Sequence, residues 1–233
     1  MASPRVEQRL EWRVVTVAET ERETPTARTL RVAVDDWPGH RPGQHVDVRL
    51  TADDGYQATR SYSLSSGPDE EPQITVERVD DGEVSPFLVD VAAPGTKVEL
   101  RGPVGGYFVW DPTNRPVLLV GGGSGIAPLR SMWRARPDDA AMTVVYSART
   151  SDRIIYADEL ADDGFDVELF VSREQVAGAH RGRIDADRLQ SIVDRRRPEQ
   201  TFVCGPTAFV ETATGGLVAA GIDARTIRTE RFG

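Results

Sequence analysis

A glycine-rich segment, Gly121-Gly122-Gly123-Ser124-Gly125, follows the apolar run from Val117 to Val120 and precedes Ile126-Ala127-Pro128. Glycines let the backbone approach a pyrophosphate closely, and the free N–H groups at the start of a helix attract its negative charge. The segment therefore predicts a nucleotide-binding turn between a strand and a helix. Ile126 stands where the usual dinucleotide fingerprint requires glycine, so this is not that fingerprint, and tight packing is the alternative interpretation.

Two shorter motifs also contain residue types that do chemistry. Arg60-Ser61-Tyr62-Ser63 follows a turn and offers a cation, an aromatic ring and hydroxyls, which can hold a phosphate, stack on a ring and donate a hydrogen bond. An ordinary exposed strand is the alternative. Cys204-Gly205-Pro206 ends an expected strand and precedes an expected helix, which places it at the sheet edge where open α/β folds bind ligands. A buried free cysteine is the alternative there.

The elements that must position the first motif are short strands separated by turns. Alternation of apolar and polar residues predicts strands over residues 12–17, 30–34, 46–50, 74–76 and 98–100. Several short strands at such spacing indicate an antiparallel barrel or sandwich. One helix interrupts them, with Ser85 as its expected N-cap and Pro86 at its first position.

The pattern of apolar residues changes near Asp111-Pro112, where the second half of the chain begins. Strands expected over residues 117–120, 143–146, 167–171 and 201–204 alternate with helices expected from the glycine loop to Arg136 and over 154–160, 185–193 and 207–220. This alternation predicts βαβ crossovers and a parallel sheet. The expected fold class is two-domain β + α/β, with an N-terminal antiparallel β-barrel over residues 1–111 and a C-terminal parallel-sheet, Rossmann-like nucleotide domain over 112–233.

The composition argues against several function classes. A formal net charge of -9 disfavours nucleic-acid binding, which needs a basic face. There is no long apolar run, so we expect no membrane span, and without the apolar core of a signal peptide near the N-terminus we expect a cytoplasmic protein. Cys204 is the single cysteine, which excludes a protein-ligated iron–sulfur cluster, and no metal site is expected.

Together these motifs resemble those of the ferredoxin–NADP reductase superfamily. The flavin motif Arg-x-Tyr-Ser is matched by Arg60, Tyr62 and Ser63, and the nucleotide motif Gly-x-Gly-x-Gly-x-x-Pro is matched from Gly121 to Pro128. Cys-Gly-Pro follows at Cys204, and the C-terminal Glu-x-aromatic is matched by Glu230 and Phe232. All four motifs occur in family order across essentially the whole chain.

The resemblance implies FAD on the barrel and a nicotinamide nucleotide on the second domain. It implies four catalytic residues: Ser63 at the flavin N5, Cys204 beside the nicotinamide C4, Glu230 tuning charge and proton supply, and Phe232 covering the flavin. The residues implied to bind the cofactors are Arg60, Ser61, Tyr62, Ser63, Arg78, Val79, Gly82, Val84, Ser85, Gly123, Ser124, Gly125, Pro128, Ser147, Arg149, Arg173, Arg183, Cys204, Gly205, Pro206 and Phe232. His45, which follows Pro42-Gly43-Gln44, is interpreted as structural.

The choice between NADPH and NADH depends on whether cations meet a 2′-phosphate or a carboxylate meets the ribose. Ser147-Ala148-Arg149-Thr150 carries no acidic residue, and Arg173 and Arg183 add two further cations. We therefore expect NADPH, with NADH possible. The alternative is that Arg173 and Arg183 merely pair with acidic side chains.

These residues predict an FAD-dependent NADPH oxidoreductase that passes electrons to a protein acceptor such as ferredoxin or flavodoxin. One alternative is the reductase component of a multi-protein oxygenase or other redox system. An electron-transfer subunit of the dihydroorotate dehydrogenase type is disfavoured, because that type carries a cysteine cluster and this chain has only Cys204. A non-enzymatic flavin- or nucleotide-binding redox sensor is the third alternative.

Overall fold

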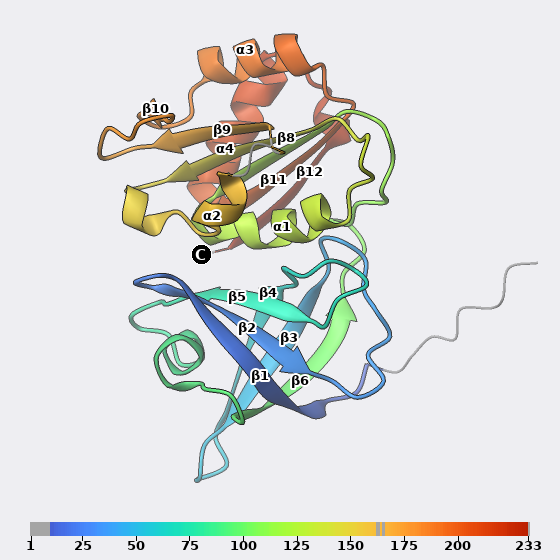
Figure 1. Cartoon of the computed structure of the whole chain (residues 1–233), viewed down its shortest axis with the longest axis vertical. Helices are drawn as coiled ribbons and strands as arrows, with labels where there is room; N and C mark the ends of the chain where they lie inside the picture. The colour runs from blue at the N-terminus through green and yellow to red at the C-terminus, as the bar shows by residue number, and fades with distance from the viewer. Residues whose placement is uncertain (1–9, 162–163, 165, 233) are drawn as a thin grey trace, which may run out of the picture.

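The computed structural model describes residues 10–161, 164 and 166–232, which form two sheets stacked along the long axis of the molecule (Figure 1). The expectation of no signal peptide rests on the first ten residues, nearly all of which lie outside the described part. No helix in the described part is long and apolar enough to cross a membrane.

The first sheet is antiparallel, with six strands in the order β4-β3-β6-β1-β2-β5. The strands are β1 (Arg13–Thr24), β2 (Ala27–Ala33), β3 (His45–Thr51), β4 (Gln57–Ser63), β5 (Gln73–Glu77) and β6 (Lys97–Val104). A bridge between Leu64 and Ile74 joins the end of β4 to β5, the two edges of the sheet. The sheet thereby closes into the expected barrel.

Side-chain alternation builds the barrel core. Val15 and Val17 of β1 are buried while Val14 is 69% exposed, because successive side chains of a strand point to opposite faces. The predicted helix exists as a short π-helix, η1 (Phe87–Val91), whose Leu88 joins this core.

The prediction that Ser85 caps this helix is wrong. Pro86 precedes η1 with no side-chain cap hydrogen bond. The Ser85 hydroxyl instead accepts a 3.0 Å hydrogen bond from the N–H of Val79. It therefore closes the turn that leads into the helix.

The second sheet has six parallel strands in the order β10-β9-β8-β7-β11-β12. They are β7 (Val117–Gly122), β8 (Met142–Ala148), β9 (Asp166–Val171), β10 (His180–Arg181), β11 (Gln200–Pro206) and β12 (Ile227–Phe232). The helices between them are η2 (Gly123–Gly125), α1 (Ile126–Arg134), η3 (Ser151–Arg153), α2 (Ala157–Leu160), α3 (Ala186–Arg196), α4 (Thr207–Ala219) and η4 (Ala224–Thr226). This confirms the expected nucleotide-binding architecture.

The two faces of this sheet are covered by different helices. Leu118 and Val120 of β7 pack in one core cluster with residues of α3 and α4. Leu119, on the opposite face, packs with α1 and with Ala27 of the barrel. The α1 face therefore lies toward the barrel, as Figure 1 shows, while α3 and α4 lie on the far side of the sheet.

The helix predicted over residues 154–160 is only partly present, because α2 begins at Ala157. Tyr156 interrupts it in the left-handed region, with φ of 60°. Its ring is buried and its hydroxyl donates to Thr75 of the barrel. Packing between the domains therefore overrides helix propensity here. The strand β12 was not predicted either, because its polar residues hide the pattern of a buried strand.

Candidate active site

Ser63 and Glu230 meet where the barrel touches the parallel sheet. The Ser63 hydroxyl, at the end of β4, donates a 2.9 Å hydrogen bond to Oε1 of Glu230 on β12. Glu230 lies in register beside Cys204 on the neighbouring strand β11. Three of the four residues predicted to be catalytic are thus adjacent, and we call them the Ser63–Glu230–Cys204 cluster. Phe232, the fourth, ends β12 opposite Pro206 and is 39% exposed.

Burial governs the charge state of this cluster. It raises the pKa of the Cys204 thiol well above its ordinary value, and the nearby Glu230 carboxylate adds to the effect. Burial also raises the pKa of Glu230, while the hydrogen bond from Ser63 and the influence of His45 oppose that rise. Cys204 is therefore a neutral thiol at physiological pH, whereas the state of Glu230 depends on its polar neighbours.

His45 lies beside the cluster, although the sequence indicated only a structural role. On β3 it pairs in register with Ser63 of β4. Directly opposed residues of an antiparallel pair place their side chains on the same face of the sheet. No motif around His45 signals this position, and only the register of β3 against β4 reveals it.

The glycine loop is shaped by close approach to β11. A side chain on Gly125 would begin 2.3 Å from the carbonyl oxygen of Cys204, and one on Gly122 would begin 2.7 Å from the Phe209 ring. Gly123 adopts φ of 55°, a conformation that favours glycine. The tight packing considered as an alternative is thus present, and it brings the loop against Cys204.

The same loop runs through η2 directly into α1, and Gly122, which precedes η2, gives this helical segment no side-chain cap. The first N–H groups of a helix have no partner within the helix, and an anion satisfies them well. Ser124, in η2, and Pro128, in the first turn of α1, flank this position. The chemistry of the loop therefore fits a bound phosphate.

Arg60 and Tyr62 alternate along β4 beside the cluster. Tyr62 is half-buried, and burial raises the pKa of its hydroxyl to about 12. Arg60 is exposed and forms an ion pair with Glu83 at 3.3 Å. Such exposed pairs are weak, so Arg60 can exchange this partner for a phosphate. The Ser61 hydroxyl is already engaged, because it donates a 2.6 Å hydrogen bond to Asp47.

In the segment after β5, backbone groups are more available to a ligand than side chains are. Arg78 pairs with Asp80 and Asp90, and Val79 is 61% exposed. Val84 is fully buried in the barrel core, so only its backbone can reach a ligand. Gly82 closes a turn by donating to the carbonyl of Val79 at 2.9 Å.

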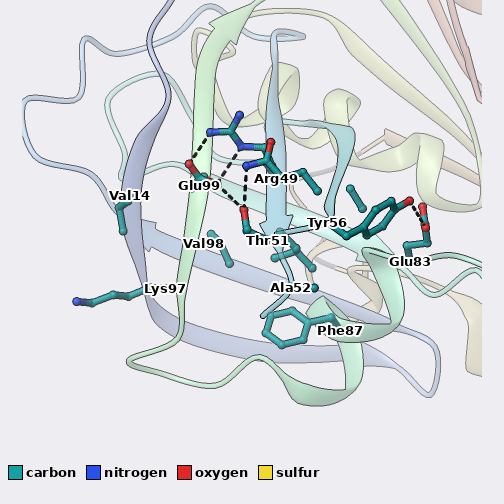
Figure 2. A pocket seen from close by; sticks show the side chains of 13 residues that line it. Val14, Arg49, Thr51, Ala52, Tyr56, Glu83, Phe87, Lys97, Val98 and Glu99 are labelled. Atoms are coloured by element: carbon teal, nitrogen blue, oxygen red, sulfur yellow. Dashed lines mark hydrogen bonds and ion pairs between the residues drawn. The ribbon is translucent and has the colours of Figure 1, made fainter. Parts of the chain in front are cut away.

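A cavity of about 750 Å³ opens next to Glu83, the partner of Arg60 (Figure 2). Tyr56 points toward Glu83 in Figure 2 and donates its hydroxyl at 2.5 Å. On the other side Arg49 pairs with Glu99. The other lining residues are apolar except for Thr51, Gln57 and Lys97, the apolar ones being Val14, Leu50, Ala52, Ala58, Phe87 and Val98. The cavity thus places the exposed ring of Tyr56 beside Glu83, the ion-pair partner of Arg60.

The predicted nucleotide arginines gather at the carboxyl edge of the sheet. Ser147 lies near the end of β8 and Arg149 just beyond it, and the N–H of Arg173 donates to the carbonyl of Arg149 at 2.9 Å. Arg183 follows β10. The guanidinium groups of these three arginines make no hydrogen bond or ion pair with residues 10–161, 164 or 166–232. Pairing with acidic side chains, the alternative explanation, therefore has no support in that part of the chain.

Comparison with known proteins identifies the family. The model of the oxidoreductase FAD-binding domain matches residues 14–109, and that of the oxidoreductase NAD-binding domain matches residues 119–214. A probable dihydroorotate dehydrogenase B electron transfer subunit from Methanocella arvoryzae is 32% identical over 89% of this chain and 74% of its own length. The chain belongs to the ferredoxin–NADP reductase superfamily. This reductase-family protein is accordingly a flavoprotein oxidoreductase with FAD- and NAD(P)-binding domains.

Other relatives are longer than this reductase-family protein. The ferredoxin reductase component of 3-ketosteroid-9-alpha-monooxygenase from Rhodococcus rhodochrous is 31% identical, over 94% of this chain and 64% of that protein. The glycine betaine monooxygenase reductase subunit of Pseudomonas aeruginosa is 34% identical, over 83% of this chain and 56% of that protein. The chain therefore spans less than two thirds of the length of these relatives.

Solved structures confirm the fold of this family member. The FAD/NAD-binding domain of nitric oxide dioxygenase from Vibrio cholerae superposes with a TM-score of 0.83 at 23% identity, covering 95% of this chain and 98% of that one. A ferredoxin NADP+ reductase from Neisseria gonorrhoeae with bound FAD and NADP superposes with a TM-score of 0.81 at 17% identity, covering 94% and 98%.

Proposed function

We propose that this reductase-family chain is an FAD-dependent NADPH oxidoreductase that passes electrons to a protein acceptor. The observation that carries the proposal is the hydrogen bond between Ser63 and Glu230, beside Cys204. It joins Ser63 of the barrel to Glu230 of the nucleotide domain, where Cys204 lies beside Glu230 on the neighbouring strand. A hydride donor held on one domain and an acceptor held on the other would meet at this point.

Bound FAD would supply the conversion from two-electron to one-electron chemistry, accepting a hydride from the nicotinamide and releasing its electrons singly. The chain supplies binding and orientation. Arg60 would hold the flavin pyrophosphate, with the backbone of Gly82 and Ser85, while the start of α1 would hold that of the nucleotide. Cys204 and Ser63 would flank the reacting atoms, and Glu230 would hold or release a proton there. Phe232 would cover the flavin and give way to the nicotinamide.

Room beyond Arg60 supports FAD in place of FMN. FMN ends at its phosphate, whereas FAD continues into an adenosine. The cavity of about 750 Å³ beside Glu83 offers space for that adenosine, with the ring of Tyr56 exposed along it. If Tyr56→Ala weakens FAD binding and leaves FMN binding unchanged, this assignment holds. Equal losses for both flavins would contradict it.

Three guanidinium groups that have no partner among the described residues support NADPH in preference to NADH. Arg149, Arg173 and Arg183 follow successive strands at the edge where ligands bind in open α/β sheets. A 2′-phosphate would provide these cations with the charge-assisted hydrogen bonds that they lack within the described chain. NADH offers only hydroxyls at that position.

The acceptor is a separate redox protein in this proposal, either a ferredoxin, a flavodoxin or an oxygenase component. Two relatives, each a reductase part of a monooxygenase system, favour the oxygenase component as a second candidate. Both candidates use the same chemistry up to electron transfer. We also propose that the two domains divide at residues 111 and 112, between β6 and β7.

Anaerobic mixing of the FAD-loaded protein with NADPH or NADH tests the proposal. We expect the visible flavin absorbance to bleach quickly with NADPH and more slowly with NADH. Faster bleaching with NADH would keep the enzyme class and overturn the choice of nucleotide. A flavin that neither nucleotide bleaches would instead support the redox-sensing, non-enzymatic alternative.

A further inference from the structure

The Glu83 carboxylate binds two side chains to which the proposed function gives roles in holding FAD. It accepts the Tyr56 hydroxyl at 2.5 Å and pairs with Nη2 of Arg60 at 3.3 Å. Nη1 of Arg60 donates to the carbonyl of Thr59 at 2.7 Å, so Glu83 provides the negative charge that this guanidinium meets. Tyr56 comes from the β3–β4 hairpin, Arg60 from β4 and Glu83 from the segment between β5 and η1. Glu83 therefore joins parts of the proposed flavin site that are distant in sequence.

Glu83 also lies within the segment whose backbone would hold the flavin pyrophosphate. Gly82 precedes it, and the buried Val84 follows it with only its backbone free to reach a ligand. A pyrophosphate held by this backbone and by Arg60 would share the guanidinium with the Glu83 carboxylate. Like charges that draw on one cation repel each other and compete for it. The carboxylate is therefore placed to oppose the binding of a phosphate at Arg60.

The exposure of these side chains allows one anion to replace the other. The Arg60 side chain is 54% exposed, the Glu83 side chain 46% and Tyr56 57%. An exposed ion pair of this kind is weak, and the planar guanidinium fork matches the oxygens of a phosphate well. The cavity of about 750 Å³ opens beside Glu83, as Figure 2 shows, so a ligand can approach the pair from that side.

We propose that Glu83 is a competing anion that sets the FAD affinity of this chain, because FAD binding exchanges Glu83 for a phosphate on Arg60. This deepens the proposed function and rests on it, since that function assigns the pyrophosphate to Arg60. Glu83 is a positioning residue that acts through the guanidinium. It holds Arg60 and Tyr56 beside the cavity, and its displacement weakens the net binding of FAD.

Calorimetric titration of the flavin-free chain with FAD tests the proposal. Glu83→Gln removes the charge and keeps an amide oxygen that can accept the Tyr56 hydroxyl. We expect its dissociation constant for FAD to fall about twofold to fivefold, which corresponds to one exposed ion pair that no longer has to be broken. An unchanged or higher dissociation constant would overturn the proposal.

Two controls separate this competition from a general effect of charge. Riboflavin has no phosphate, so it should bind the wild type and Glu83→Gln equally. Glu19→Gln is the matched variant, because Glu19 is also an exposed carboxylate paired with an arginine, Arg31, and lies on β1, which β3 and β6 separate from β4. It should bind FAD as the wild type does. An equal gain with riboflavin, or in Glu19→Gln, would contradict the proposal.

The Arg60→Gln background decides whether Glu83 acts through Arg60. Without the guanidinium there is no pair to exchange, so adding Glu83→Gln should change FAD affinity less than it does in the wild type. A gain of the same size in both backgrounds would overturn the competition for Arg60.

Failure of the proposed function is distinguishable from failure of this inference. If the proposed function is wrong, bound FAD will not be bleached by NADPH or NADH. The FAD titrations use no nucleotide, so they still decide the role of Glu83. If only the inference is wrong, the flavin will bleach and the FAD affinities of the wild type and Glu83→Gln will be equal.

Discussion

Arg130 of α1 spans the interface between the two domains and lies over the ring of Tyr156, with its guanidinium carbon 4.6 Å from the ring centroid. Its Nη1 donates to Oε1 of Gln73 on β5 at 2.8 Å, and its other nitrogens pair with Glu159. The Arg130 side chain is only 8% exposed. This buried contact ties the nucleotide domain to the barrel on which Ser63 lies, so it fixes the geometry of the proposed site.

Replacing Arg130 should destabilise the protein strongly. Arg130→Met leaves Glu159 and Gln73 in the interface without their main partner, and removing one member of a buried ion pair costs about 3 kcal/mol or more. Urea denaturation measures the free energy of unfolding. Arg134→Met, one turn along the same helix, is the control. It pairs with Glu70 and, at 3.4 Å, with Glu159, and all three side chains are about one-third exposed, so we expect a loss below about 1 kcal/mol. Equal losses in both variants would show that the Arg130 contacts stabilise the protein no more than those of Arg134.

Ser63→Ala should slow hydride transfer while leaving flavin binding intact. The variant removes the hydroxyl that bonds to Glu230 and keeps the β4 backbone. Losing one oriented hydrogen-bond donor at a reacting centre costs about a hundredfold to a thousandfold in rate. Stopped-flow bleaching measures that rate. Ser61→Ala, whose hydroxyl bonds to Asp47, should bleach at the wild-type rate. A wild-type rate in Ser63→Ala would remove Ser63 from the reaction.

Neutralising Arg173 and Arg183 together should raise the Michaelis constant for NADPH at least about a hundredfold, because each hydrogen bond to a charged group contributes about 1.5–3 kcal/mol net of exchange with water. The constant for NADH should change little. Steady-state kinetics with both nucleotides measure the difference. Arg115→Gln/Arg225→Gln removes the same charge from exposed sites elsewhere and should affect neither. Equal changes for NADPH and NADH in the Arg173/Arg183 variant would exclude a 2′-phosphate contact.

Because of Glu230, the free energy of unfolding should fall as pH rises above the range in which an ordinary carboxyl group titrates. Folding raises its pKa, so the folded state binds a proton more tightly than the unfolded chain. Its contribution is complete below the unfolded pKa of about 4.5 and is lost as pH rises through the folded pKa.

Glu230→Gln has no such proton to lose. Relative to the wild type it should therefore be more stable at pH 7 than at pH 4. Urea denaturation at the two pH values gives the comparison, with Glu199→Gln as the control. A constant difference between variant and wild type would show that the pKa of Glu230 is not raised on folding.

Local sequence patterns determined the type and order of most elements. Period-two alternation identified barrel strands such as β3, and the apolar run before Gly121 identified β7. Glycine, proline and cysteine motifs identified the loops at the sheet edge, because their chemistry depends on a few neighbouring residues. The apolar pattern failed to identify β12, because this strand lies at the edge of the sheet beside β11 and carries polar side chains such as Glu230 and Arg231.

Tertiary structure decided which of those residues meet. Tyr156 breaks a predicted helix because contacts with the barrel hold its ring and hydroxyl in place. Helix propensity, which depends on local sequence, does not include such tertiary contacts. His45 became part of the site only through its register with Ser63. The sequence alone determined the family, the two domains' architectures and the chemistry of each motif, since these follow from local residue types. The contact of Ser63 with Glu230, the buried Arg130 bridge and the position of His45 arise from packing between distant segments, which local spacing cannot specify.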